Sequence, residues 1–218
     1  LDLYARYIVS WALDDTLDLL RETGLEGEIS DEGCLSLYGD EAEFRADRDH
    51  IEILERFGFP HEVLAQQAIR ALEPELSDRI GLAVLFPQNR SMRDPYKLVL
   101  ALAGRFAALG GQVETGDVVG FTRSDTIREV VLRDGRRLAA DEVVIAAGAF
   151  AGRLAKALGE PIPLETERGY HTQIMAPGMT LRHSIIWPAR AFMVTPTAGG
   201  IRVGGTVEMA GLDAPPDY

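Results

Sequence analysis

The sequence predicts a fold that combines helices with sheets, of the α+β or α/β class. Residues 1–110 have mostly helical periodicity, whereas short strand patterns dominate the rest of the 218-residue chain. The run Val143–Ala147 is apolar at every position, which is typical of a strand buried on both faces of a parallel sheet. The strands after residue 160 are joined by short turns such as Gly199–Gly200, so we expect a mostly antiparallel sheet there.

Each helix predicted in the first half has a recognisable start or stop. In Trp11–Arg21, the residues Leu13, Leu17 and Leu20 share one face, and Gly24 follows as a stop signal. The other predicted helices are a charged one that Asp40 caps and that reaches about Phe57, one over His61–Leu72 that stops before Pro74, and one from Pro95 to Gly110–Gly111.

Strands are predicted between these helices and after them. A hairpin is expected where Ile127–Leu132 and Arg137–Ala139 flank the turn Asp134–Gly135. A helix over Ala149–Leu158 follows the apolar run and its glycine. The remaining predicted strands are Cys34–Tyr38, Gly81–Phe86, Leu164–Met175, His183–Trp187, Ala191–Thr195 and Gly200–Glu208.

Composition narrows the class of protein. The chain has 22 Lys and Arg against 34 Asp and Glu, a formal net charge of −12, which argues against a nucleic-acid partner. Cys34 is the single cysteine, so we expect no intrachain disulfide. No apolar run approaches the roughly 18 residues of a membrane span. The histidines are scattered, so we expect no metal site. We expect a cytoplasmic protein, with membrane association of a full-length form as the alternative.

Four segments carry a resemblance to a known family. They are 110-GGQVETGDVVGF-121, 135-GRRLAADEVVIAAGAFAGRLAKALG-159, 168-RGYHTQI-174 and 201-IRVGGTVEMAG-211. They resemble FAD-dependent oxidoreductases of the D-amino-acid oxidase and dehydrogenase family, and most closely the bacterial D-amino-acid dehydrogenases. The resemblance implies an FAD-binding dinucleotide domain, with residues 94–159 as its later part. It also implies a substrate domain, built from a helical part over residues 1–93 and an antiparallel sheet over residues 160–218.

One hallmark of this family is absent from the sequence. The family places a G-x-G-x-x-G fingerprint near its N-terminus, whereas this chain contains no G-x-G at all. That fingerprint sets the FAD diphosphate on a helix N-terminus. We therefore expect the chain to be the interior of a longer enzyme. We expect FAD to bind to the full-length protein and to be absent from this chain alone.

The resemblance points to three cofactor-binding residues. Val119 matches a valine that contacts the adenine through its backbone, with Val118 as the alternative if the register differs by one. Ala147 and Gly148 match a turn that approaches the diphosphate or ribose, where a larger side chain would hold the backbone away. The simpler alternatives are a core strand residue for Val119 and an ordinary strand-to-helix turn for Gly148.

The substrate-binding candidates lie on one predicted strand. Arginine and tyrosine suit the carboxylate of an amino acid, since a guanidinium can bind it through two parallel hydrogen bonds. Arg168 and Tyr170 share one face of the strand, and His171 faces the other way. Arg190 and Phe192 are weaker candidates. The family's usual carboxylate arginine often lies further toward the C-terminus, and no catalytic residue is assigned.

Three functions are compatible with these features. The first is part of a flavin-dependent dehydrogenase that oxidises the Cα–N bond of a D-amino or imino acid, with the hydride passing to FAD. The second is a flavoenzyme of the same superfamily that oxidises a 2-hydroxy acid. The third is a flavin-free domain that binds a small molecule. The expected partners are a small amino-acid substrate and, for the full-length protein, an electron acceptor.

Overall fold

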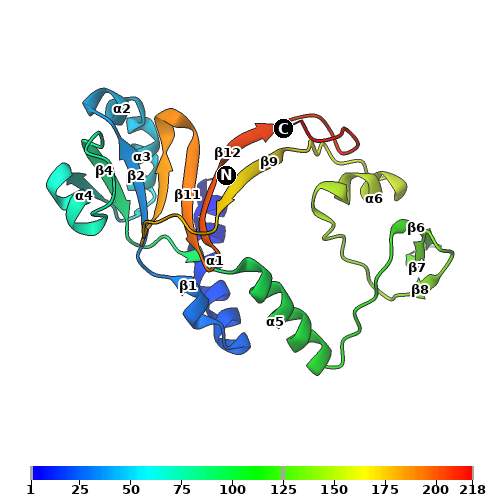
Figure 1. Cartoon of the computed structure of the whole chain (residues 1–218). Helices are drawn as coiled ribbons and strands as arrows, with labels where there is room; N and C mark the ends of the chain where they lie inside the picture. Colours follow the sequence, from blue (N-terminus) through cyan, green and yellow to red (C-terminus); the bar gives the residue numbers. More distant parts are fainter. Residues whose placement is uncertain (1, 124–125, 218) are drawn as a thin grey trace. The chain divides into compact units, whose positions relative to one another are not determined.

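The computed structural model describes residues 2–123 and 126–217, and leaves the side chains of residues 2–12 outside the description. The chain divides into two compact units (Figure 1). Unit 1 comprises Leu1–Gly111 and Tyr170–Thr206, and unit 2 comprises Gln112–Gly169 and Val207–Tyr218. Helices with mixed and antiparallel sheets confirm the predicted fold class. The assignment of residues 1–93, 94–159 and 160–218 to cofactor and substrate domains stays a prediction.

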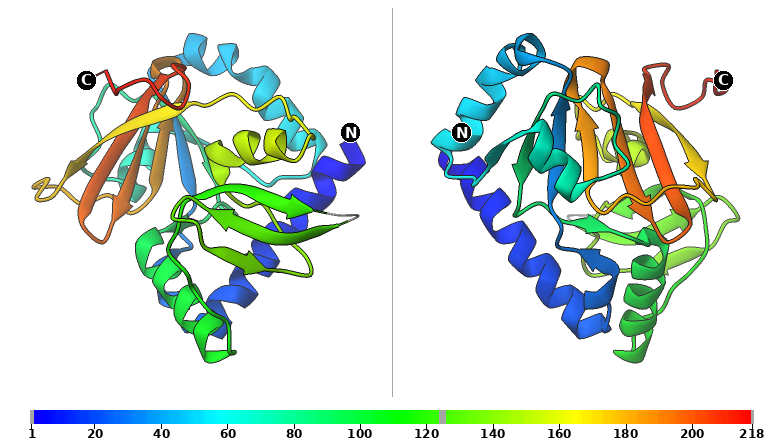
Figure 2. Two further views of the ribbon diagram at one scale, coloured as in Figure 1. Left: turned by 90° about the vertical axis from the view of Figure 1, so that its right-hand side faces the viewer. Right: turned by 60° about the vertical axis from the view of Figure 1, so that its left-hand side comes forward.

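A seven-stranded sheet forms the centre of unit 1 (Figures 1 and 2). Its strands, in spatial order, are β3 (Glu62–Ala65), β4 (Leu82–Phe86), β2 (Cys34–Tyr38), β10 (Ser184–Trp187), β11 (Phe192–Thr197), β12 (Gly200–Glu208) and β9 (Arg168–Ile174). Strand β2 pairs with β10 in parallel and with β4 antiparallel. Strands β10, β11 and β12 pair antiparallel, which confirms the prediction for these late strands.

Helices and a small ladder complete unit 1. The helices are α1 (Asp2–Thr23), α2 (Glu41–Ala46), α3 (Arg48–Arg56), α4 (Gln66–Leu72) and α5 (Pro95–Ala108), and the ladder joins β1 (Ile29–Ser30) to β5 (Ser91–Met92). On α1, Leu20 is buried and Leu13 and Leu17 are half-buried, as expected for one face. The side chain of Trp11 lies outside the described residues.

Two predicted helices differ from the observed ones. Asp40 does cap α2, since its carboxylate accepts bonds from Ala42 N and Glu43 N at 2.8 and 2.9 Å. The helix ends at Ala46, however, and α3 starts after Asp47, whose carboxylate accepts a 2.7 Å bond from the Tyr38 hydroxyl. An aspartate held by another element interrupts a helix readily.

The second difference concerns the helix predicted over His61–Leu72. Its first residues, Glu62–Ala65, form strand β3 instead, which pairs antiparallel with β4 and buries Leu64. Pairing with an existing sheet outweighed the local helical pattern, because strand formation depends strongly on neighbouring strands. Only Gln66–Leu72 is helical.

The sheet of unit 1 is packed on both faces. Leu35, Leu37 and Ile185 belong to a core cluster that includes Ile69 of α4, and Tyr38 and Val84 pack with Ile51 of α3 in a second cluster. Cys34 is buried in β2, and burial raises the pKa of its thiol to about 11. The thiol therefore stays protonated at neutral pH and acts as a small core residue.

Unit 2 has a three-stranded antiparallel sheet and one helix. The sheet has the order β6 (Val118–Arg123), β7 (Ile127–Leu132) and β8 (Arg137–Ala139), and the helix α6 (Ala151–Ala157) follows a 3-10 turn over Gly148–Phe150. The observed β7 and β8 confirm the predicted hairpin. Residues 124 and 125 lie outside the description.

The run Val143–Ala147 is not the buried parallel strand that its composition predicted. It belongs to no strand, and the side chain of Val144 is 89% exposed. A buried parallel strand needs a hydrogen-bonded neighbour on each side. Within the described part of the chain, no strand pairs with this run. Its apolar residues therefore form an open surface rather than a core.

Candidate functional site

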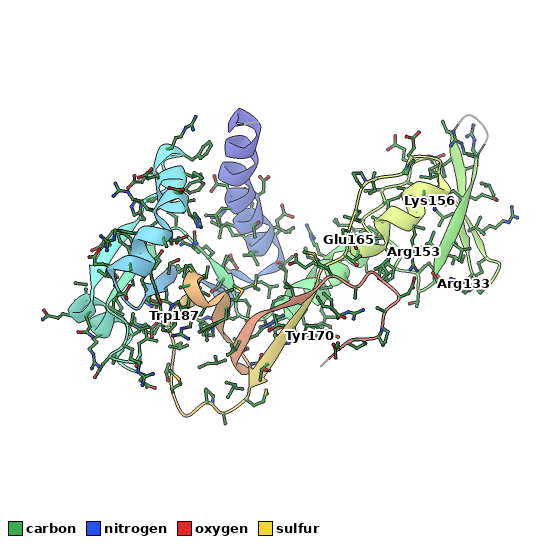
Figure 3. The ribbon with its side chains drawn as sticks, turned by 90° about the horizontal axis from the view of Figure 1, so that it is seen from above. Arg133, Arg153, Lys156, Glu165, Tyr170 and Trp187 are labelled. Atoms are coloured by element: carbon green, nitrogen blue, oxygen red, sulfur yellow. The ribbon has the colours of Figure 1, made fainter. Side chains whose placement is uncertain are left out.

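A hollow of about 600 Å³ lies beside the first strand of unit 2. It is lined by Gly116, Asp117, Val118, Val119, Arg133, Ala147, Phe150, Arg153 and Leu154. The lining thus combines backbone of β6, the turn before α6, two guanidinium groups and apolar side chains. Figure 3 labels Arg133, in the turn of the β7–β8 hairpin, and Arg153 on α6. Val119 and Ala147, two of the three predicted cofactor residues, meet at this hollow.

Val119 occupies an irregular position in its strand. In the β6–β7 register, Val118 pairs with Leu132 and Gly120 with Val131, so Val119 has no partner across the ladder. A residue at such a bulge is left out of the regular ladder bonding. The register therefore leaves the backbone of Val119, unlike that of Val118, outside the regular ladder pairing.

Gly148 has a backbone conformation that favours glycine. Its φ is +52°, in the left-handed region, and a Cβ added there would meet no atom within 4 Å. The turn is thus sterically open on this side. Gly148 does not itself line the hollow, whereas the preceding Ala147 does.

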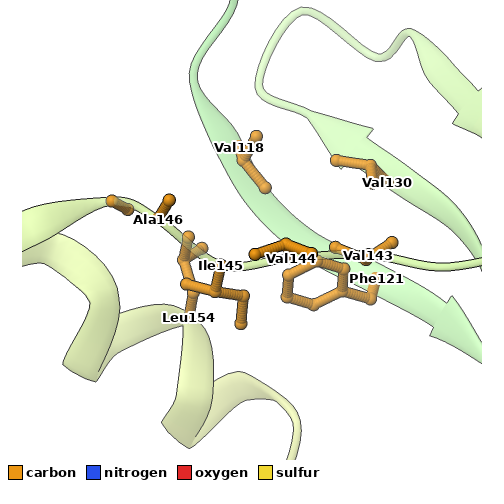
Figure 4. A pocket seen from close by; sticks show the side chains of 9 residues that line it. Val118, Phe121, Val130, Val143, Val144, Ile145, Ala146 and Leu154 are labelled. Atoms are coloured by element: carbon orange, nitrogen blue, oxygen red, sulfur yellow. The ribbon is translucent and has the colours of Figure 1, made fainter. Parts of the chain in front are cut away.

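A second, more apolar hollow of about 400 Å³ adjoins the first (Figure 4). It is lined by Val118, Phe121, Val130, Val143, Val144, Ile145, Ala146, Ala147 and Leu154. The two hollows share Val118, Ala147 and Leu154. The apolar run that was predicted as a buried strand therefore forms one wall of an unfilled space.

The charged groups at the larger hollow are paired but exposed. Arg133 lies 2.6 Å from Asp117, and Arg153 lies 2.6 Å from Asp213 and over the Phe150 ring at 6.0 Å. Exposed pairs of this kind contribute at most about 1 kcal/mol, so an anionic ligand can compete for the guanidinium groups. Open backbone, an apolar wall and nearby cations fit the adenosine and phosphate groups of a dinucleotide.

The first substrate candidate, Arg168, is engaged within unit 2. Its guanidinium lies 2.8 Å from the Glu208 carboxylate and donates to the carbonyl of Ala214 at 2.7 Å. Both side chains of the pair are largely buried. A substrate carboxylate would have to replace these acceptors, so Arg168 is better placed to hold the two segments of unit 2 together.

Tyr170 and His171 lie on opposite faces of β9. A Cβ added to Gly204 of β12 would lie 3.6 Å from the His171 Cβ, whereas one added to Gly205 would lie 2.7 Å from the Phe192 Cβ. Because neighbouring residues alternate, Tyr170 shares the face of Gly205 and Phe192. His171 is exposed on the other face, where its Nδ1 lies 3.2 Å from the Arg202 guanidinium.

Two features of unit 1 were not found from the sequence. Glu73, fully buried after α4, accepts bonds through Oε1 from Arg182 N, His183 N and the His183 ring at 2.9, 2.7 and 2.7 Å. Trp187, at the end of β10, donates from Nε1 to Glu43 at 3.0 Å and carries the Arg190 guanidinium over its ring. The Glu73–His183 and Trp187–Glu43 hydrogen bonds join residues more than a hundred positions apart. The contact between Trp187 and Arg190 depends on the turn between β10 and β11. No local sequence pattern indicates either feature.

Two searches of the described residues returned nothing. None of the described helices is long and apolar enough to cross a membrane. No group of three or more His, Cys, Asp and Glu side chains in the described ranges could hold a metal ion.

Comparison with known proteins gives a consistent match along the chain. A model of the family described as FAD dependent oxidoreductase matches residues 3–218. The D-amino-acid oxidase of Bradyrhizobium diazoefficiens is 32% identical over 200 residues, which cover 92% of this chain and 47% of that protein. The D-amino acid dehydrogenase of Sinorhizobium medicae is 32% identical over 204 residues, 88% of this chain and 48% of that protein. The chain spans about half the length of these curated relatives.

Solved structures share the fold. The glycine oxidase from Bacillus cereus matches with a TM-score of 0.76 and 22% identity, over 95% of this chain and 57% of that one. The L-proline dehydrogenase from P. horikoshii matches with a TM-score of 0.75 and 23% identity, over 94% and 57%. At these identities the likeness establishes the fold alone.

Proposed function

Because the chain belongs to the FAD-dependent oxidoreductase family, we propose that it is part of a flavoenzyme that oxidises the Cα–N bond of an amino acid. FAD is the cofactor of this family. The family match over almost the whole chain carries the proposal. The names of the curated relatives, D-amino-acid oxidase and D-amino acid dehydrogenase, favour a D-amino or imino acid as the substrate.

The larger hollow of unit 2 would hold the adenosine end of the cofactor. The bulged backbone of Val119 would contact the adenine, and the open turn at Ala147 and Gly148 would allow close approach of the ribose or diphosphate. Arg133 and Arg153 border the same space. When FAD is bound, its flavin ring supplies the acceptor for a hydride from the substrate Cα.

Tyr170 would bind the substrate. Its hydroxyl can donate a hydrogen bond to the substrate carboxylate and so help to orient the α-hydrogen. Tyr170 lies on the sheet face that also carries Phe192, whereas His171 points to the opposite, exposed face. His171 therefore has no role in this proposal. Arg168 would stabilise unit 2 through Glu208 rather than bind the substrate.

The test uses the full-length protein, a panel of D-amino, L-amino, imino and 2-hydroxy acids, and a dye as electron acceptor. We expect oxidation of an amino or imino acid and a yellow protein. Tyr170→Phe should lower kcat/KM by about tenfold to a hundredfold, which corresponds to about 1.5–3 kcal/mol for one hydrogen bond to a charged group. His171→Ala is the matched control, and it should have little effect.

The outcomes separate the alternatives. Turnover of 2-hydroxy acids alone would replace the proposed reaction by the second one, and a colourless protein would favour a flavin-free domain. If His171→Ala lowers kcat/KM strongly while Tyr170→Phe leaves it unchanged, the substrate lies on the other face of β9. The 218-residue chain by itself should bind FAD weakly, because it has no glycine fingerprint. Tight stoichiometric binding in a titration would contradict that expectation.

A further inference from the structure

The segment that follows β12 forms a short loop in unit 2, held at both ends. Residues 209–214, called the strap below, leave the strand after Glu208 and turn at Gly211, whose φ is +72°. The guanidinium of Arg168 lies 2.8 Å from the Glu208 carboxylate and donates to the Ala214 carbonyl oxygen at 2.7 Å. One side chain of β9 therefore fixes the start and the end of the strap.

The strap brings Asp213 to a residue that lines the larger hollow. Arg153 lines this hollow from α6, and its Nη2 donates to Asp213 Oδ2 at 2.6 Å. Because Arg168 already fixes the ends of the strap, the pairing of Asp213 with Arg153 costs little further chain freedom. The Asp213 carboxylate thus occupies a donor of a guanidinium that borders the hollow.

The other arginine of the hollow is paired in a different way. Arg133 lies 2.6 Å from the Asp117 carboxylate, and its backbone N–H donates to the Asp117 carbonyl oxygen at 2.8 Å. Both residues line the hollow. The backbone bond keeps this pair side by side in the wall, whereas the partner of Arg153 comes from a separate loop. Arg153 is therefore the guanidinium that can exchange its partner.

The pair of Arg153 and Asp213 is weak enough for such an exchange. The two side chains are 52% and 86% exposed, and exposed ion pairs contribute little to stability. A diphosphate carries more charge than one carboxylate and offers several acceptor oxygens, so it can bind a guanidinium through two parallel bonds. The Phe150 ring, with its centre 6.0 Å from the guanidinium carbon, supports Arg153 at the border of the hollow.

We propose that Asp213 is an internal competitor for the anionic part of the ligand in the larger hollow. In the closed state, Asp213 pairs with Arg153 and holds the strap against α6. In the open state, a phosphate of an adenine dinucleotide binds Arg153, and the strap is held by Arg168 alone. This inference deepens the proposed function and rests on it, because the hollow is there assigned to the adenosine end of FAD.

The first experiment measures the affinity of ADP, which shares its adenosine and diphosphate with FAD, for the flavin-free full-length protein by calorimetry. Asp213→Asn should tighten ADP binding by about twofold to fivefold, the size of an exposed ion pair. Arg153→Gln should weaken it by about tenfold. Glu160→Gln is the matched control, because it removes the same charge at an exposed position after the far end of α6. It should leave the affinity unchanged.

A double variant separates competition from simple repulsion. If Asp213 only repelled the nucleotide, Asp213→Asn would tighten ADP binding equally with and without Arg153. Competition requires this gain to vanish in the Arg153→Gln background. A gain that persists there, no gain in the single variant, or no binding of ADP to the parent protein would each overturn the proposal.

The second experiment follows the strap itself. Ala210 is exposed and Cys34 is buried, so Ala210→Cys can be labelled with a nitroxide once any further cysteine of the full-length protein is replaced by serine. ADP should increase the mobility of this label in the electron paramagnetic resonance spectrum. Asp213→Asn should give the mobile spectrum without ADP. A label that responds to neither change would show that the pair only fastens the strap to α6, against the proposal.

The two proposals fail in different ways. If the protein oxidises an amino acid but Asp213→Asn leaves the affinity for ADP unchanged, the proposed function stands and the competition is wrong. If ADP releases the strap while no amino acid is oxidised, the competition stands and the reaction must be reassigned.

Discussion

The two units differ in how completely they bury their own apolar residues. In unit 1, Leu35 and Val84 are fully buried, and the sheet is packed on both faces. In unit 2, Leu132 is the one buried hydrophobic residue among those described, while Val144 is 89% and Val113 70% exposed. Unit 1 therefore has a core of its own, whereas unit 2 leaves most of its apolar side chains accessible.

The open surface of unit 2 coincides with its candidate site. The whole run Val143–Ala147 lines the smaller hollow, and Ala147 also lines the larger one; scattered exposed residues would not produce such a contiguous wall. Under the proposal that the chain is part of a longer flavoenzyme, FAD and further chain would cover this wall. The difference suggests that the cofactor site is shared with other segments, while Tyr170 lies in the self-contained unit.

The largest expected effect concerns the buried Glu73–His183 pair of unit 1. Glu73→Leu removes the acceptor of three hydrogen bonds and leaves buried donors unpaired. We expect the free energy of unfolding of unit 1 to fall by about 3–5 kcal/mol. Urea unfolding followed by tryptophan fluorescence measures this directly, because Trp11 and Trp187 both belong to unit 1.

Glu75→Leu is the control for this substitution. Glu75 is exposed and accepts a single 3.3 Å bond from Thr180 N. Its replacement should change stability by less than about 0.5 kcal/mol. Equal effects of the two substitutions would mean that the Glu73 pair does not hold unit 1 together.

The same pair should make the stability of unit 1 sensitive to acid. Burial opposes ionisation of Glu73, but hydrogen bonds from His183 and Arg182 and the charge of His183 outweigh it, so the pKa of the carboxyl lies below its ordinary value. A lowered folded-state pKa stabilises the protein above the unfolded pKa of about 4.3, and this stability is lost as the pH falls through the folded value.

Glu73→Gln tests this dependence because it keeps an acceptor oxygen but cannot titrate. The free energy of unfolding, measured in urea between pH 7 and pH 3, should fall less steeply with acid in Glu73→Gln than in the parent protein. Parallel profiles would show that other carboxyl groups dominate acid unfolding.

A smaller effect is expected at the turn of unit 2. Gly148→Ala places a Cβ at a positive φ, which costs about 1–2 kcal/mol of local stability. In the full-length protein it should also lower the flavin content, because the Cβ stands where the backbone is open toward a ligand. Gly148→Val should lower it further. The ratio of flavin to protein absorbance is the measurement.

Gly159→Ala provides a matched control in the same unit. Gly159 also has a positive φ, +85°, and an added Cβ there meets no atom within 4 Å, but it follows the C-terminal end of α6, whereas Gly148 directly follows Ala147, which lines both hollows. The two substitutions should cost similar stability, and only Gly148→Ala should lose flavin. Equal flavin contents would remove Gly148 from the cofactor site.

The sequence predicted elements that depend on local chemistry. Strand β2, the β7–β8 hairpin and the Asp40 cap were all predicted from residues close together in the chain. The errors arose where distant residues decide: Glu62–Ala65 joined the sheet through β4, and Val143–Ala147 has no described neighbour with which to form a strand.

The residues of the candidate site also differ in whether nearby or distant parts of the chain determine them. Val119, Ala147 and Gly148 were assigned through the family resemblance and stay predictions, although two of them meet at one hollow. Arg190 stays a weak candidate, and its stacking on Trp187 depends on a turn that packs against Gly205. Glu73 had no signal, since its partners lie more than a hundred residues away.

The smallest effect, at Val144, is measured against the same substitution in the core of unit 1. Val84→Thr buries an unpaired hydroxyl in the core of unit 1, which should cost about 1–3 kcal/mol. Val144→Thr changes a side chain that is 89% exposed, so in this chain the cost should be within about 0.5 kcal/mol. In the full-length protein, Val144→Thr should become costly if further chain or FAD covers the wall. Thermal unfolding of both proteins, with flavin content as a second readout, measures the difference. If Val144→Thr changes neither the thermal stability nor the flavin content of the full-length protein, this surface of unit 2 is exposed to solvent there as well. The two units would then differ in the size of their cores, and no other segment or cofactor would cover unit 2 at this wall.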